Sequence, residues 1–285
     1  MAGFWKLIST GLSTGKYYSS MNEALRKLND EYTMLHYPFF VNENDDFFTA
    51  QKNLTDYCLS HVSDFRGKRV LEIGCGNGVQ SLYVKQKHMP DYIKGIDLNA
   101  SNIEIAKKEA SRLGLADIEF ETGDAQNLVN IPDNSFDIVI NIESAFHYSD
   151  KQAFLKEIDR IMKPGGTFIL ADILTRSVRN KWIWRFWKRK MNFNHWEKES
   201  YENGFNLANL LVQNATEITE DVIKGFRMYK QWLKSMERQG FVSRMFLKLF
   251  YTINTRLNIH LLNKRQLYYV FVGTSAEQRR FENLS

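Results

Sequence analysis

Short apolar runs alternate with segments of helical periodicity through the middle of the chain. Five of these runs predict strands, at residues 69–73, 92–97, 118–122, 136–140 and 167–172. Helical spacing of apolar positions marks three of the stretches between them, at residues 80–87, 101–113 and 149–162. In the second of these helices, Ser101 and Glu104 stand in capping-box register. Strands that alternate with helices of this length predict an α/β fold, with a parallel sheet and helices on both faces.

The regions that flank this alternation are predicted to be mostly helical. An apolar stripe at helical spacing runs from Tyr18 to Tyr32, and a second helix is expected at residues 48–61. The elements expected after the alternation are a helix at 195–203, a strand at 207–217, a helical stretch at 219–258 and a strand at 266–274.

Composition places the chain among ordinary globular proteins. Of its 285 residues 44% are apolar, and the net charge of +5 is too modest to argue for nucleic acid by itself. Its two cysteines, Cys58 and Cys75, show no spacing typical of a metal or redox site, so no metal is predicted. We see no signal-type apolar core, and no run approaches the roughly 20 apolar residues of a membrane span. A cytoplasmic protein is therefore expected, soluble or at most lying on a membrane surface.

A glycine-rich turn at residues 70–78 is the strongest local feature. The run Val70-Leu-Glu-Ile-Gly-Cys-Gly-Asn-Gly78 predicts a buried strand, then a turn with glycine at every second position, then a helix. Such a turn presents backbone N–H groups to a ligand, and glycines let the main chain approach that ligand closely. The dinucleotide fingerprint needs a third glycine where this chain has Val79, so the turn departs from that fingerprint.

Polar side chains follow three of the predicted strands. Asp97 lies about 20 residues beyond the glycines, where nucleotide-binding α/β folds place a carboxylate on the ribose; a plain helix cap is the alternative. Asp124 follows the third strand and could accept from an adenine amine, while Ala125 offers a backbone N–H; an ordinary turn is the alternative. Asn141 and Glu143 end the fourth strand, at the edge where open α/β sheets bind ligands.

Taken in order along the chain, these motifs resemble those of class I S-adenosylmethionine-dependent methyltransferases. The resemblance covers roughly residues 67–175 and rests on five motifs, at residues 70–78, 95–97, 123–125, 135–139 and 162–166. It implies a Rossmann-like, mostly parallel sheet of seven strands, with an antiparallel last strand at residues 266–274. It also implies S-adenosyl-L-methionine as cofactor, S-adenosyl-L-homocysteine as product, and a glycine turn that receives the methionyl end. The residues that it places at the cofactor are Glu72, Gly74, Gly76, Asp97, Leu98, Asp124, Ala125 and Asn141.

Residues 141–148 look like the small-molecule branch of this family. That branch includes sterol, tocopherol, phosphoethanolamine, glycine/sarcosine and phthiotriol-type methyltransferases, and the Asn-Pro-Pro-Tyr motif of adenine-N6 methyltransferases is absent. His147 is the candidate base for a hydroxyl or ammonium acceptor, because histidine titrates near neutral pH. Glu143 stands four residues earlier, so a helical turn would let its carboxylate orient the imidazole. The alternative is that His147 only caps or packs at the sheet edge.

Basic and aromatic residues interleave at 176–193. Three interpretations remain open: a lid over the acceptor pocket, an amphipathic helix on an anionic membrane, and an RNA contact. The resemblance also implies an N-terminal helix over the cofactor, with Tyr17 or Tyr18 near the histidine, although Tyr18 fits the core stripe as well. The predicted segments are a helical cover (1–66), the cofactor-binding core (67–175), the lid (176–193), a core helix and strand (194–218), a helical cap (219–262) and the last strand with the tail (263–285).

The sequence therefore predicts methyl transfer from S-adenosyl-L-methionine to a lipophilic small molecule. The apolar helices of residues 219–258 indicate a substantial cap and so a bulky acceptor. O-methylation is slightly favoured over C- or N-methylation. The alternatives are methylation of protein or RNA through the basic segment, and a cofactor-binding partner without turnover. Residues 176–193 are the segment through which peripheral membrane contact would occur if the membrane interpretation holds, and the oligomeric state stays open.

Overall fold

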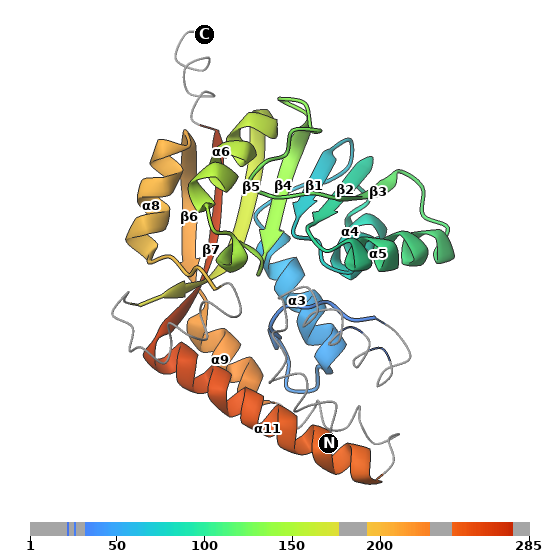
Figure 1. Ribbon diagram of the computed structural model, residues 1–285, viewed down its shortest axis with the longest axis vertical. Coiled ribbons are helices and arrows are strands. Elements are labelled where there is room, and N and C mark those ends of the chain that lie inside the picture. Colours follow the sequence, from blue (N-terminus) through green and yellow to red (C-terminus); the bar gives the residue numbers. More distant parts are fainter. Residues whose placement is uncertain (1–21, 23–25, 27–31, 177–192, 229–240, 276–285) are drawn as a thin grey trace.

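The fold is built on one seven-stranded sheet, seen here in a computed structural model (Figure 1). The structure describes residues 22, 26, 32–176, 193–228 and 241–275. The strand order is β3-β2-β1-β4-β5-β7-β6, and β7 runs antiparallel to both of its neighbours. The strands are β1 Arg69–Ile73, β2 Tyr92–Asp97, β3 Ile118–Thr122, β4 Phe136–Ile142, β5 Met162–Thr175, β6 Leu210–Glu217 and β7 Gln266–Ser275. The predicted Rossmann-like α/β sheet with an antiparallel last strand is therefore confirmed.

Helices cover both faces of this sheet. Successive residues of a strand point to opposite faces, and in the central strands the side chains on both faces are apolar, so both faces are packed against helices. The described helices are α3 Phe47–Leu59, α4 Val79–His88, α5 Ala100–Arg112, the 3-10 helix η1 Ala145–His147, α6 Lys151–Ile161, α8 Lys198–Leu207, α9 Thr219–Arg227 and α11 Phe241–Lys264. Val70 and Ile138 pack with side chains of α3, α4 and α9. Leu71 and Val139 face the other side, where they pack with α6 and α8. Buried apolar layers on both faces thus hold the sheet rigid under the loops at its edge.

The starts of two core helices differ from the sequence prediction. The N-cap of α5 is Asn99, whose side chain accepts from the Ser101 N–H at 3.1 Å, so the predicted capping box that began at Ser101 is wrong. An asparagine just upstream offers the helix an earlier cap of the same quality. Similarly, α6 follows Asp150, which accepts from the Ala153 N–H at 2.9 Å, rather than starting at residue 149.

Strand β5 is much longer than the predicted run at 167–172. It begins at Met162, passes through Pro164 and ends at Thr175. It pairs with β4 at Met162 and again at residues 167–171, and it pairs with β7 on its other side from Thr167 to Thr175. Pairing on both edges extends the strand beyond what its apolar pattern alone indicates, and α6 accordingly stops at Ile161.

Other predicted elements are shifted or only partly described. The helix expected at 195–203 and the strand expected at 207–217 are found as α8 and β6, each displaced toward the C-terminus at its start. Residues 219–258 contain α9 and the first part of α11, which runs on to Lys264. Residues 32–46 form neither helix nor strand, although residues 1–66 are predicted to be mostly helical. The segment 177–192, the stripe from Tyr18 to Leu28, and residues 229–240 lie outside the described residues.

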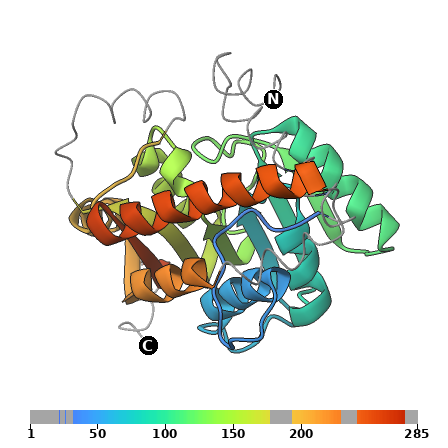
Figure 2. The same cartoon turned by 90° about the horizontal axis from the view of Figure 1, so that it is seen from below.

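Helix α11 occupies an outer position on one side of the molecule. Figure 1 shows it crossing below the sheet, next to α9, and Figure 2 shows it passing in front of the sheet in the view from below. None of the helices in the described part of the chain is long and apolar enough to cross a membrane.

Candidate functional site

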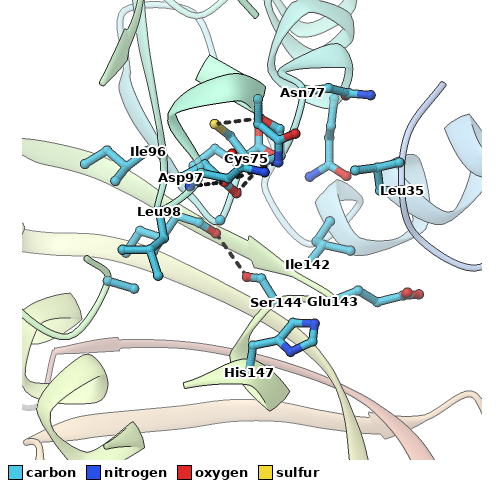
Figure 3. A pocket seen from close by; sticks show the side chains of 18 of the residues that line it. Leu35, Cys75, Asn77, Ile96, Asp97, Leu98, Ile142, Glu143, Ser144 and His147 are labelled. Carbon is cyan, nitrogen blue, oxygen red and sulfur yellow. Dashed lines mark hydrogen bonds between the residues drawn. The ribbon is translucent and has the colours of Figure 1, made fainter. Parts of the chain in front are cut away.

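A cavity of about 430 Å³ lies at the carboxyl ends of β1 to β4 (Figure 3). Its walls come from the segments that directly follow these four strands, together with residues 34–36. Because parallel strands end at one edge, residues far apart in sequence meet here, as open α/β sheets generally arrange. The predicted site residues that line the cavity are Glu72, Gly74, Gly76, Asp97, Leu98, Asp124, Ala125, Glu143 and His147.

The remaining predicted residue, Asn141, lies just behind the cavity wall. It is fully buried, and its amide donates to the Ile73 carbonyl at 2.9 Å, to Ser144 Oγ at 2.7 Å and to Tyr148 Oη at 3.1 Å. These bonds tie the end of β4 to the end of β1. The Asn141 Oδ1 atom is buried without a hydrogen-bond partner in this part of the structure. The role of Asn141 that the structure supports is therefore to shape the wall.

The glycine turn is closed by steric contacts that only glycine permits. Gly74 has φ +74°, and a Cβ there would collide with Ser144 Oγ and lie 2.8 Å from Tyr148 Oη. Gly78 has φ +79°, and its Cβ would lie 2.5 Å from the Cβ of Ala106 on α5. Such values of φ are costly for residues with a side chain. The turn is thus pressed against the loop after β4 on one side and against α5 on the other.

Asp97 fixes the same turn from the end of β2. Its carboxylate accepts from the backbone N–H of Gly76 at 3.0 Å and of Asn99 at 2.8 Å. Burial raises its pKa, and these hydrogen bonds oppose the rise because they stabilise the anion. The two interpretations of Asp97 are therefore compatible, since one carboxylate organises the helix start and also lines the cavity.

Two buried carboxyl groups in the cavity have strongly shifted pKa values. Burial raises the pKa of Glu72 to about 8, against the opposing effect of the Ser81 hydroxyl, which donates to its Oε2. Burial also raises the pKa of Glu143 to about 8, against the opposing hydrogen bond from the Tyr37 N–H at 2.7 Å. At neutral pH both groups are therefore mostly protonated and uncharged.

The expected arrangement of Glu143 beside His147 is wrong. Glu143 has φ +51° and precedes η1, which covers only Ala145–His147, so no helical turn places the two side chains on one face. The Glu143 carboxyl group is bonded to Tyr37 and lies near the Tyr268 hydroxyl. Figure 3 shows it pointing away from the imidazole. It therefore does not orient the His147 ring.

Aromatic rings and backbone hydrogen bonds hold His147 instead. Its ring lies 5.4 Å from that of Phe193 in a stacked arrangement and 4.3 Å from that of Phe146. The Phe146 N–H donates to Asp172 Oδ1 at 3.1 Å, and the Phe146 carbonyl accepts from the Asn194 N–H at 2.6 Å. Thus η1 is clamped between the end of β5 and the segment that follows residue 192.

A buried charge pair supports this clamp. Burial raises the pKa of Asp172 to about 6, and the opposing effects of the Lys151 ammonium and the Tyr201 hydroxyl keep it from rising further. Tyr201 Oη donates to Asp172 Oδ2 at 2.5 Å, and the Lys151 ammonium donates to the Asn194 carbonyl. Sequence reasoning missed this network, because Lys151 opens an amphipathic helix, where a lysine is normally exposed.

His36 is a further cavity residue that the sequence analysis missed. Its imidazole contacts Thr55 Oγ1 at 3.2 Å, and burial lowers its pKa to about 4, so the ring is neutral at physiological pH. His36 belongs to a stretch without regular secondary structure, and neither periodicity nor a motif marks it. Only the packing of residues 34–36 against the sheet edge places it in the cavity.

Comparison with known proteins assigns the chain to a family. The family model described as a methyltransferase domain matches residues 64–240. The chain belongs to this methyltransferase family. The fatty-acid O-methyltransferase of Mycolicibacterium smegmatis is 39% identical over 120 residues, 42% of this chain and 42% of that protein. A phthiotriol/phenolphthiotriol dimycocerosates methyltransferase of Mycobacterium tuberculosis is 38% identical over 142 residues, 50% of this chain and 51% of that protein.

The chain spans about half the length, or less, of the curated relatives that it matches. Among solved structures, a putative sarcosine dimethylglycine methyltransferase from Galdieria sulphuraria superimposes with a TM-score of 0.75 at 14% identity. That match covers 90% of this chain and 98% of the other chain. At this identity the match shows a common fold, which agrees with the methyltransferase domain and leaves the acceptor open.

Proposed function

We propose that this methyltransferase domain transfers a methyl group from S-adenosyl-L-methionine to a lipophilic small-molecule acceptor, with oxygen as the favoured acceptor atom. One observation carries the proposal: a single cavity contains the glycine turn, the strand-end carboxylates Asp97 and Asp124, and the His147 ring. A donor and an acceptor held in one enclosed space need no further approach before they react.

The residues of the turn fit the methyl donor. Gly74 and Gly76 would hold its amino-acid end, Asp97 with Leu98 its ribose, and Asp124 its adenine. A Cβ at Gly76 would already come within 3.3 Å of Leu35 on the opposite wall, so glycine keeps this part of the cavity open. The chemistry that the donor supplies is a methyl group on a sulfonium, with S-adenosyl-L-homocysteine as the leaving product.

His147 and Glu143 would serve the acceptor half of the cavity. The imidazole of His147 takes the proton that a hydroxyl acceptor loses when its oxygen is methylated. Protonated Glu143, with its pKa of about 8, donates a hydrogen bond to an acceptor oxygen and does not repel an anionic one. An acceptor that is already a carboxylate needs no base, so there His147 would only position the substrate.

The names of the relatives support a lipophilic acceptor. One is named for a fatty acid and the other for phthiotriol dimycocerosates. The neutral state of Glu143 at physiological pH agrees with this, because an uncharged acceptor half is less costly to fill with an apolar chain.

Calorimetry and a label-transfer assay test the proposal. The protein should bind S-adenosyl-L-methionine, and Asp97→Ala should weaken this binding strongly, whereas Glu220→Gln on the surface of α9 should not change it. Labelled donor with a panel of fatty acids and total lipid extract should yield a labelled lipid. Absence of donor binding would refute the central claim, and label recovered only in protein or RNA would refute the acceptor class.

A further inference from the structure

The outward face of α11 carries an apolar stripe. Leu249, Ile253 and Leu257 are 59%, 59% and 45% exposed, and their spacing of four residues puts them on one side of the helix. The opposite side is buried, with Thr255 and Leu262 packed into the protein. A surface helix normally turns its apolar residues inward, so three large exposed aliphatic side chains in a row mark an interaction surface.

Positive charge accompanies this stripe. Residues 241–264 contain no aspartate or glutamate, whereas they contain two arginines, two lysines and one histidine. Arg256, His260 and Lys264 are exposed, and their spacing places them on the same side as Leu249. The outward face of α11 therefore has an apolar half toward the N-terminus and a basic half toward the C-terminus.

This helix also lies close to the acceptor half of the cavity. The Tyr37 N–H donates to Glu143 Oε1 at 2.7 Å, and the Tyr37 hydroxyl lies 3.5 Å from Asn258 Oδ1 on the inner side of α11. One residue therefore separates the helix from the cavity carboxyl group. Figures 1 and 2 show α11 as an outer layer on this side of the sheet.

We propose that the outward face of α11 docks on an anionic lipid surface and that the methyl acceptor is a lipid drawn from that surface. The second part rests on the proposed function. Aliphatic side chains enter the boundary between headgroups and acyl chains, and flanking arginine and lysine are attracted to anionic headgroups. A second copy of this face would meet its own positive charge, and nucleic acid would leave the aliphatic stripe without a contact.

Vesicle flotation without any cofactor tests the docking. The full chain should float with vesicles of phosphatidylcholine and phosphatidylglycerol, and high salt or phosphatidylcholine alone should reduce the bound fraction. The variant Leu249→Gln/Ile253→Gln/Leu257→Gln should bind on the order of a thousandfold more weakly, since each of the three lost aliphatic contacts is worth about tenfold. Its melting curve should match that of wild type, because all three positions are exposed.

A matched control removes the same kind of side chain elsewhere. Val129 and Leu207 are 75% and 70% exposed and belong to other elements, so Val129→Gln/Leu207→Gln should float like wild type. Equal flotation of the stripe variant and wild type, or no flotation of wild type, would overturn the docking. A dimer that dissociates only in the stripe variant would assign the face to a second copy and would also overturn it.

Activity assays test the source of the acceptor separately. With a long-chain fatty acid in anionic vesicles as probe, the stripe variant should lose methylation at least tenfold, whereas with a short-chain, water-soluble fatty acid it should match wild type. Full activity of the variant on the vesicle-borne probe would overturn the lipid-surface source. Flotation without methylation of any lipid would leave the docking in place and refute the proposed function, so the two failures are distinguishable.

Discussion

Glu143→Gln tests the unusual protonation state of the cavity. Burial raises the pKa of the Glu143 carboxyl group to about 8, so this group is uncharged at neutral pH. Glutamine has nearly the same shape as a protonated glutamate, and its Oε1 can still accept the hydrogen bond from the Tyr37 N–H. The substitution therefore removes the titration and leaves the packing and the principal hydrogen bond in place.

The expected effect follows from the shifted pKa. A folded-state pKa above the unfolded value of 4.5 means that the stabilising contribution of Glu143 is complete below pH 4.5 and is lost as the pH rises through about 8. At about 1.36 kcal/mol per pKa unit, the titration of this group lowers the free energy of unfolding by roughly 2 kcal/mol between pH 6 and pH 8. The glutamine variant should lose this part of the pH dependence and become more stable than wild type at pH 9.

Urea denaturation at several pH values between 6 and 9 measures this difference. Glu72, with its own pKa of about 8, should give the variant and wild type a shared fall in stability, so only the difference between their curves reports on Glu143. Glu220→Gln controls for the loss of one glutamate at the surface. Parallel curves for wild type and Glu143→Gln would show that Glu143 is ionised throughout and would refute the argument.

Three further changes test other parts of the site. Lys151→Met leaves Asp172 without its cation and should lower the free energy of unfolding by roughly 3–5 kcal/mol at pH 8. The loss should be smaller at pH 5, where Asp172 can take up a proton, so urea denaturation with equal losses at both pH values would contradict this. Gly78→Ala forces a Cβ to 2.5 Å from that of Ala106 at φ +79° and should cost about 1–3 kcal/mol, seen as a lower melting temperature; an unchanged melt would contradict the steric argument. His147→Gln should lower kcat for a hydroxyl acceptor by roughly 10²–10⁴-fold, measured with labelled donor, while the affinity for the donor stays unchanged. Loss of donor binding in this variant would instead place His147 in the donor half of the cavity.

The half of the cavity that we propose for the donor could be located from the sequence because its signals are local. The glycine turn, Asp97 and Asp124 each follow a strand that is predicted from its own apolar run. The carboxyl ends of parallel strands meet at one edge of the sheet, so these residues are expected to lie close together. Correct positions for the strands are therefore enough to predict that these residues line one cavity, and the predicted strands that precede these residues lie close to those of the structure.

The acceptor half depends on contacts that no short pattern encodes. The spacing of Glu143 and His147 predicted a helical turn, but Glu143 takes a positive φ and bonds to Tyr37, more than 100 residues earlier in the sequence. Likewise, Asp172 and Asn194 hold η1 only because β5 extends to Thr175 and the chain returns at residue 193. Tertiary packing overrides local spacing at these positions.

The two halves of the cavity also differ in charge, and this difference bears on the acceptor. Asp97 keeps hydrogen bonds that stabilise its anion, which suits a site for a cationic sulfonium donor. Glu143 is uncharged at neutral pH. Tyr37 connects it to the inner side of α11, because Tyr37 bonds to Glu143 through its N–H and lies close to Asn258 through its hydroxyl. In the proposed arrangement the donor lies beside Asp97 and the acceptor beside the uncharged Glu143, so an apolar acceptor enters without the cost of stripping water from a buried charge. With the proposed docking, the exposed aliphatic stripe on the outer side of the same helix would supply such an acceptor from the nearest apolar phase, a lipid surface.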